Sequence, residues 1–223
     1  MEQRHARRRT LLALAAGIGL PAVLRQTIAQ TSPRQGVRSA QGEVRINGER
    51  AAPGALVRAG DTLVLGSRAF VAFVVGQDAY LLRENSRVEL AGGGLVVDAL
   101  RLVTGKLLGV FGGGRGRRLV TATATIGIRG TGAYVEADPA RTYFCLCYGT
   151  AEVAAAAGGA RATYSTRHHE SPRYIYGDGR RAAIVPASVA NHTDSELLML
   201  EALVGRTPPP SFMESPYMSN PYR

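Results

Sequence analysis

The stretch Ala-Thr-Ile-Gly-Ile-Arg-Gly-Thr-Gly-Ala-Tyr-Val, residues 124–135, carries two glycines, Gly130 and Gly132, within a region of β-type sequence. Such glycines permit a positive φ, or the close approach of another backbone, within a strand. We therefore predict a β-bulge or a tight crossing between layers at this point. Arg129 has two interpretations, an anion-binding residue or an anchor for a carboxylate or carbonyl group within the fold, and we favour the anchor. The segment predicts a feature of the fold and not a catalytic site.

Short β-type runs precede and enter this stretch, and each gap between them holds Gly, Asn, Asp or Ser. The runs are Val44–Ile46, Leu56–Arg58, Thr62–Leu65, Ala69–Val75, Ala79–Arg83, Val88–Leu90, Leu95–Val97, Arg101–Val103, Leu107–Phe111 and Leu119–Thr125. Asn47-Gly48 is typical of a hairpin turn. Because no helix-length periodic segment separates the runs, the pattern predicts a mainly β single domain of about ten or more short strands, arranged as a β-sandwich, a β-roll or a short solenoid.

Five segments in order resemble the FecR domain. They are Val44–Gly48, Gly60–Leu63, Tyr80–Leu82 with Ser86–Leu90, Gly105–Leu108 and Ala124–Val135, and the most specific residues are Ile128, Arg129, Gly130, Thr131 and Gly132. The resemblance covers about residues 42–155. In that family the domain is the periplasmic part of iron-dicitrate-type signalling regulators, and a preceding cytoplasmic segment and membrane helix reach a sigma factor. We recognise neither of those parts here, so the resemblance implies fold and compartment and not contact with a sigma factor.

Residues 1–29 have the three parts of a signal peptide: a basic start, an apolar stretch over 11–24, and a small-residue end at 27–29. Arg8-Arg9 followed by Thr-Leu-Leu resembles the twin-arginine pattern and favours export of the folded protein, with an ordinary secretory signal as the alternative. The apolar run is too short to span a bilayer, so we expect cleavage and no transmembrane anchor. The expected location is periplasmic, or otherwise exported, in a Gram-negative envelope.

The formal net charge of the chain is +10, and the five arginines and one glutamate of residues 1–29 account for four of these charges. Lys106 is the only lysine among 27 basic residues. An exported basic protein is a poor candidate for nucleic-acid binding. The partners that we expect are an envelope protein, a ligand or a cell-wall component.

Motifs of enzymes are missing from the sequence. We find no Gly-x-Ser-x-Gly elbow, no phosphate-binding loop and no distinctive pair of carboxylates. The glycine-rich segment 112–118 lacks the Lys-Ser/Thr ending of a phosphate loop and precedes a strand, so we interpret it as a flexible basic hairpin loop. The sequence therefore predicts a non-catalytic binding or signalling module.

Cys145 and Cys147 stand two apart in the run 143–148, where Tyr143 shares their strand face and Phe144, Leu146 and Tyr148 share the other. Their Cα atoms should be roughly 6.6 Å apart with parallel side chains, so a disulfide would need a kinked strand. His168-His169 follows in a polar, loop-like segment.

Two thiols in an oxidising compartment need an explanation, and three are open: a metal site with His168 and His169, a strained disulfide, or inert buried thiols. A metal site would suit zinc, copper or iron and defines the alternative function, a metal-binding or redox protein. The same cysteines with His168 are also the only nucleophile and base that we can assemble.

The C-terminal part predicts one helix that packs on the β domain. Thr193–Glu196 has the form of a capping box, and Gly205 followed by prolines ends the apolar pattern. His192 would supply a third imidazole, but we expect it to be exposed. The expected segments are a signal peptide (1–29), a flexible lead-in (30–41), a FecR-like β domain (42–157), a loop-rich extension with His-His (158–190), the helix (191–205) and a disordered Pro-rich tail (206–223).

Overall fold

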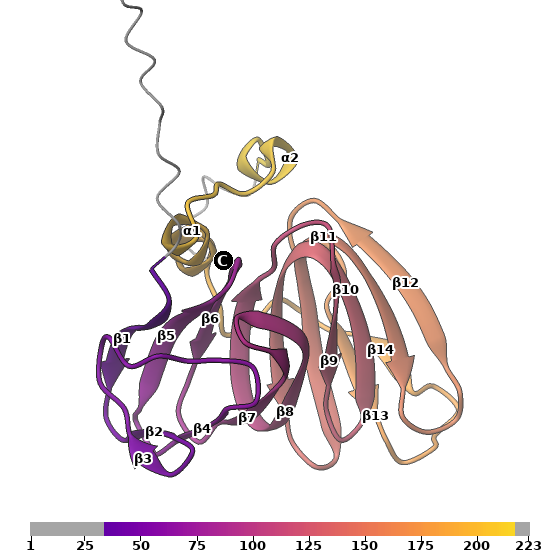
Figure 1. The fold of residues 1–223 in the computed structure, drawn as a ribbon. Helices are drawn as coiled ribbons and strands as arrows, with labels where there is room; N and C mark the ends of the chain where they lie inside the picture. The colour runs from indigo at the N-terminus through magenta and orange to yellow at the C-terminus, as the bar shows by residue number, and fades with distance from the viewer. Residues whose placement is uncertain (1–33, 217–223) are drawn as a thin grey trace, which may run out of the picture. The chain divides into compact units, whose positions relative to one another are not determined.

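A computed structural model of the chain describes residues 34–216, and the expected signal peptide lies outside them. The described residues form fourteen strands in one sheet and two short helices (Figure 1). The strands are β1 (Gly36–Gln41), β2 (Val44–Ile46), β3 (Glu49–Arg50), β4 (Thr62–Leu65), β5 (Phe70–Val75), β6 (Asp78–Leu82), β7 (Arg87–Gly93), β8 (Val96–Val110), β9 (Gly116–Val120), β10 (Ala124–Ala137), β11 (Arg141–Ala155), β12 (Arg161–Thr166), β13 (Arg173–Tyr176) and β14 (Ile184–Pro186); the helices are α1 (Asp194–Leu203) and α2 (Pro210–Met213). The predicted fold class, mainly β with a C-terminal helix, is confirmed.

Strand β10 changes its neighbour halfway along. Residues 125–129 pair with β9, whereas residues 132–137 pair with the second half of β8. The change falls between Arg129 and Gly132, where the register with β11 also shifts and Gly130 has a φ of +54°. The bulge predicted from the two glycines is therefore present, and it is the point where the sheet exchanges one neighbouring strand for another.

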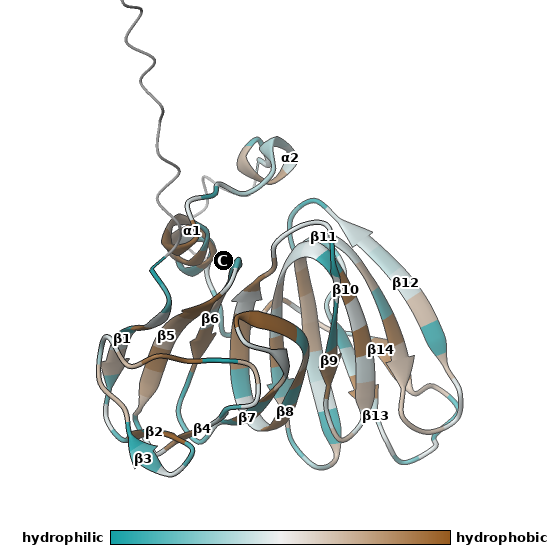
Figure 2. Cartoon of the chain, in the orientation of Figure 1, coloured by the Kyte–Doolittle hydropathy of each residue, from teal (hydrophilic) through white to brown (hydrophobic). Residues whose placement is uncertain are grey.

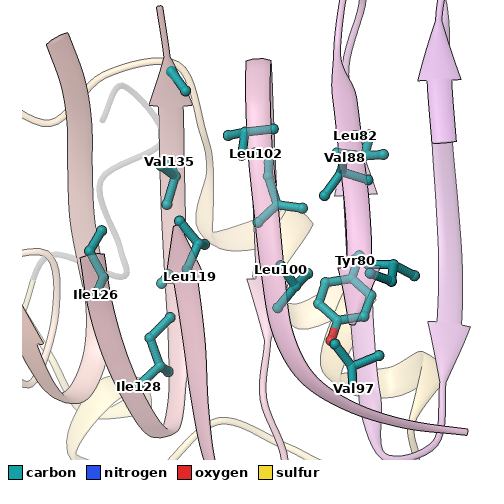
Figure 3. Close-up of a cluster of buried hydrophobic side chains, with 14 of the residues drawn as sticks. Tyr80, Leu82, Val88, Val97, Leu100, Leu102, Leu119, Ile126, Ile128 and Val135 are labelled. Atoms are coloured by element: carbon teal, nitrogen blue, oxygen red, sulfur yellow. The ribbon is translucent and has the colours of Figure 1, made fainter. Parts of the chain in front are cut away.

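Both faces of the central strands are buried. In β5, Val71, Phe73 and Val75 point into one apolar cluster, the main core, and the alternate residues Ala72 and Val74 point into a second, the helix-side core. Figure 3 shows main-core side chains from the middle of the sheet, among them Leu100, Leu119, Ile126, Ile128 and Val135. The helix-side core consists of Ala72, Val74, Ala79, Leu81, Leu108, Val110, Tyr134, Tyr143, Cys145, Cys147, Tyr148, Leu197, Leu200, Val204 and Phe212.

Helix α1 covers the helix-side core and contacts β6 and β8. Thr193 is its N-cap, and the predicted capping box with Glu196 is formed in both directions. Leu197 and Leu200 are fully buried against the sheet, and the Glu196 carboxylate lies 2.7 Å from the guanidinium of Arg83. Figure 2 shows hydrophobic colouring on α1 and on β5 and β6. No helix among residues 34–216 is long and apolar enough to cross a membrane.

Two predicted loop segments are strands instead. Part of the expected lead-in, residues 36–41, forms β1 and pairs with β5, because Val37 is buried in the main core. The expected loop-rich extension contains β12, β13 and β14, which continue the sheet beyond the predicted domain boundary at residue 157. β12 alternates exposed and half-buried residues at an edge, so its sequence has little apolar character to mark it as a strand.

The tail predicted to be disordered is ordered as far as it is described. α2 begins at a proline, and Phe212 is fully buried in the helix-side core beside Tyr148, with ring centroids 5.2 Å apart. Phe212 thus packs this turn on the helix-side core, where its ring also contacts that of His168. The rest of the tail, residues 217–223, lies outside the described residues.

Candidate metal site

Cys145 and Cys147 lie on β11 and face the helix-side core, with both side chains fully buried and unbridged. The predicted division of faces is correct for Phe144 and Leu146, which enter the main core, but wrong for Tyr148. A register shift opposite Gly132 and Ala133 leaves Cys147 between two paired residues, so Tyr148 points to the same side as the cysteines. The cysteines therefore lie under α1 and α2.

His169 reaches the cysteines from the turn after β12. Its backbone N–H donates to the Cys147 carbonyl at 3.0 Å, which fastens the turn to β11, and its φ of +54° lets the chain reverse there. The ring Nδ1 then lies 3.4 Å from Cys145 Sγ. This contact confirms that the His-His segment covers the cysteine face.

His192 arrives from the segment just before α1. It is buried, not exposed as the sequence suggested, and its ring stacks on Tyr134 with centroids 4.5 Å apart and planes at 15°. Its Nε2 lies 3.1 Å from His169 Nδ1. Because Leu197 and Leu200 of α1 pack on the sheet, the segment that precedes the helix also lies on the sheet.

Four ligand atoms therefore converge, from Cys145, Cys147, His169 and His192, and all lie within 4.8 Å of one another. A tetrahedral zinc ion, with bonds of about 2.0 Å to nitrogen and about 2.3 Å to sulfur, separates its ligand atoms by about 3.3 to 3.8 Å. The observed separations of 3.1 Å between the two nitrogens and 3.4 Å between nitrogen and sulfur are close to those edges. Two thiols and two imidazoles form a donor set that suits a metal ion.

The hydrogen bonds of the two imidazoles determine which nitrogens face the centre of the cluster with a lone pair. His169 Nε2 is 2.9 Å from Asp194 Oδ1, and His192 Nδ1 is 2.7 Å from the Ala190 carbonyl oxygen. Both partners only accept, so these two nitrogens carry the protons. In the neutral rings, His169 Nδ1 and His192 Nε2 then present lone pairs to each other. The repulsion is relieved when one of the nitrogens accepts a proton, for instance from the Cys145 thiol 3.4 Å from His169 Nδ1, or when both bind a metal ion.

His168 does not join the four ligands. Its Nε2 lies 2.9 Å from Asp194 Oδ2, and its ring packs on Phe212 with centroids 4.6 Å apart. Asp194, at the first turn of α1, thus holds one histidine with each carboxylate oxygen. A carboxylate behind a ligating imidazole orients it and increases its basicity, which is the usual support of a metal-bound histidine. Of the four residues predicted from the sequence, Cys145, Cys147 and His169 lie together with His192, whereas His168 belongs with His169 and Asp194 to a second group of potential ligands.

The surroundings shift the pKa of Cys145 in the direction that suits a ligand, and those of Cys147 and His169 in the opposite direction. The neighbouring Cys147 thiol, and then the imidazoles of His169 and His192, hold the pKa of Cys145 well below its usual range although burial opposes them. Burial raises the pKa of Cys147. For His169, burial favours the neutral ring, but the hydrogen bonds to Asp194 and Cys145 outweigh it and raise its pKa to about 9. In the metal-free cluster these shifts favour the ionised sulfur of Cys145 and the protonated ring of His169.

Cys145, His169 and Asp194 also stand in the order of a nucleophile, a base and an orienting carboxylate. A nucleophile must meet its substrate, yet Cys145 is 0% exposed beneath the helix-side core, and His169 Nδ1 is shared with His192. The burial of the sulfur therefore argues against nucleophilic catalysis.

The five signature residues lie apart from this cluster. Ile128 is buried in the main core, Thr131 is fully buried with its hydroxyl unbonded to any described residue, and the Thr131 carbonyl accepts from the Phe111 N–H. Arg129 is exposed and forms no hydrogen bond or ion pair within residues 34–216, so the expected anchoring role is wrong. Gly132 lies against the ring of Tyr148, and a Cβ atom added to Gly132 would be 2.6 Å from that ring. These residues therefore determine the course of β10 and do not belong to the cluster of cysteines and histidines.

No family model matches the chain, and no curated protein is similar to it. Two solved structures of a "putative anti-sigma factor" from Parabacteroides distasonis ATCC 8503 are similar to it at 9% identity, with TM-scores of 0.47 and 0.49. The matches cover 57% and 63% of this chain and 59% and 64% of the two structures. The chain thus spans less than two thirds of either structure, and a similarity this low supports no statement about its function.

Proposed function

We propose that this protein is an exported, non-catalytic metal-binding protein that holds one zinc ion through Cys145, Cys147, His169 and His192. The observation that supports this best is the pair of opposed imidazole nitrogens, whose protons are directed outward by Asp194 and Ala190. Two thiolates complete a tetrahedral donor set of two sulfurs and two nitrogens. This set favours zinc over octahedral ions, and copper and iron are the alternatives that metal analysis separates.

Cobalt(II) substitution tests the proposal. Cobalt(II) bound to thiolates in a tetrahedral site should give intense visible bands and a sulfur-to-cobalt charge-transfer band when it is added to reduced, metal-free protein. His169→Ala and His192→Ala should each weaken or change these bands, whereas His168→Ala should keep the same tetrahedral spectrum. A wild-type protein without thiolate charge transfer would contradict the proposal. A spectrum that depends on His168 and not on His192 would restore the ligand set expected from the sequence.

A second candidate function is a binding or signalling module of the envelope, which is favoured by the five segments that resemble the FecR domain between residues 42 and 155. In this function the sheet recognises an envelope protein, a ligand or a cell-wall component, and the zinc ion holds the C-terminal segment in place. Crosslinking in intact envelopes tests it. A discrete crosslinked partner that persists in Cys147→Ser would favour recognition by the sheet independent of metal, and the absence of any partner would count against the module.

Export itself is part of the proposal, and it depends on Arg8 and Arg9. Replacing both by Lys should block delivery through the folded-protein route, because that route reads the arginine pair and not the charge alone. Cell fractionation measures the outcome. Normal delivery of the double variant to the envelope would contradict the folded-protein route and would favour the ordinary secretory route. Retention of the wild-type protein in the cytoplasm would contradict export by either route.

A further inference from the structure

The four proposed ligands are not held equally. Cys145 and Cys147 belong to β11, where Cys145 pairs with Tyr134 of β10, and the strand also pairs with β13 just before the cysteines and with β12 just after them. His169 is fixed by its own backbone hydrogen bond to Cys147 and by Asp194 on α1. His192 lies, like His169, outside the strands and helices; the partner of its Nδ1 is the carbonyl of Ala190, and its ring is held by the stack on Tyr134. Turning this ring away from Tyr134 breaks no strand pairing of β11 and leaves the backbone hydrogen bond of His169 intact.

An open cleft adjoins the same residue. It has a volume of about 490 Å³ and is lined by Pro172 and by residues 187–192, which include His192 itself. Both cysteine side chains are fully buried, so His192 is the proposed ligand that separates the ion from this space. The lining residues carry no charged side chain besides an imidazole, so a small neutral or singly charged molecule meets no opposing charge there.

We infer that the zinc ion enters and leaves through this cleft by dissociation of His192, so that the site exchanges its ion with a thiol donor from solution and is not a permanently closed structural site. This inference rests on the proposed zinc site. The step is a ligand substitution: the bond from zinc to His192 Nε2 breaks, and a bond from zinc to the incoming thiolate sulfur forms. The thiol proton passes to the freed imidazole, and nothing is oxidised or reduced. A thiol fits because zinc accepts sulfur readily and the residues that line the cleft carry no acidic, lysine or arginine side chain.

The rate of zinc transfer to a chromophoric chelator, with and without added free cysteine as the thiol, tests the inference. Ser188→Trp places a large ring in the lining of the cleft without altering a ligand. Ser39→Trp, at an exposed position of β1, is the matched control. Ser188→Trp should slow transfer about tenfold at unchanged zinc affinity, since access sets the rate, whereas Ser39→Trp should transfer like the wild type. Val189→Trp serves the same purpose if Ser188→Trp does not fold.

His192→Ala is the complementary variant. It should still bind zinc through three ligands, release it faster than the wild type, and lose the acceleration by free cysteine, because the position that cysteine takes is already open. Equal transfer rates in the wild type, both cleft variants and His192→Ala would overturn the inference while leaving the zinc site intact. A wild-type protein that binds no zinc would instead contradict the proposed function itself, so the two failures are distinguishable.

Discussion

His169 Nδ1 and His192 Nε2 face each other across 3.1 Å, and the opposite nitrogen of each ring donates a proton to a fixed acceptor. The two residues are 23 positions apart and come from different segments of the chain, the turn after β12 and the approach to α1. Their opposition connects the fold with the proposed chemistry, since the same docking of α1 that buries Leu197 and Leu200 also brings His192 and Asp194 to the cysteines.

Asp194→Asn should weaken zinc binding about 10- to 100-fold, because the carboxylate orients His169 and increases its basicity. Competition with a chelator of known affinity measures the dissociation constant. Asp178→Asn is the matched control, since Asp178 is exposed and pairs only with the neighbouring Arg180 among the described residues. Wild-type zinc affinity in Asp194→Asn would show that Asp194 does not contribute to zinc binding.

Zinc binding should release about two protons at pH 7.5, one from His169 and one from Cys147, because binding requires both groups to lose their protons. These two groups are expected to carry protons in the metal-free protein, because the pKa of His169 is raised to about 9 and that of Cys147 is also raised. The pKa of Cys145 is lowered, so this residue is not expected to contribute a proton. Affinity should therefore rise with pH, and the contribution of His169 should disappear above about pH 9.

Titration calorimetry in buffers of different ionisation enthalpy counts these protons. His169→Ala should release about one proton less than the wild type, because no imidazolium has to lose its proton when zinc binds. Proton release that is independent of pH from 6.5 to 9.5 would contradict the assignment of His169 as a ligand.

Leu200→Ala should destabilise the metal-free protein by about 2 to 5 kcal/mol, because the side chain is fully buried between α1 and the sheet. Met199→Ala, one residue away and 38% exposed, should change the free energy of unfolding by less than about 0.5 kcal/mol. Urea denaturation compares the two. Equal, small effects would mean that α1 does not cover the helix-side core in solution.

Gly132→Ala should destabilise the fold by about 1 to 3 kcal/mol, because its Cβ would lie 2.6 Å from the Tyr148 ring at the bulge. Gly127→Ala is the control on the same strand, where the nearest atoms are 3.9 Å away. Thermal unfolding monitored by circular dichroism separates them. A Gly132→Ala protein as stable as Gly127→Ala would show that the bulge is not constrained by Tyr148.

The sequence predicted the parts of the fold that local pattern determines. Turn residues between short apolar runs gave the mainly β class, and Thr193 with Glu196 gave the start of α1. Strands β12 and β14 escaped prediction because short edge strands lack the apolar pattern of central strands. β13 lies between β11 and β14, but it has only four residues, of which Ile175 alone is buried. Phe212 escaped for a similar reason, since one buried ring in a proline-rich tail leaves no periodic signal.

The candidate site was predicted in part. The pair of cysteines marked the strand, and the neighbouring histidines marked the loop, but the choice between His168 and His169 depends on the turn geometry at φ +54°. His192 and Asp194 lie about 45 residues beyond the cysteines and reach them only when α1 docks, so no local spacing could reveal them. The structural signal is the apolar stripe of α1, which draws its preceding segment onto the sheet.

The metal content of full-length protein purified from the envelope is the most direct test of the zinc site. The wild type should carry close to one zinc ion per chain, and Cys147→Ser should carry none and lose several kcal/mol of stability, since binding at a structural-type site is worth on the order of 10 kcal/mol before the loops are ordered. Thiol titration completes the measurement: both cysteines should become reactive once a chelator removes the ion. Wild-type protein without zinc, copper or iron, whose thiols react only after reduction, would mean a disulfide and would contradict the account.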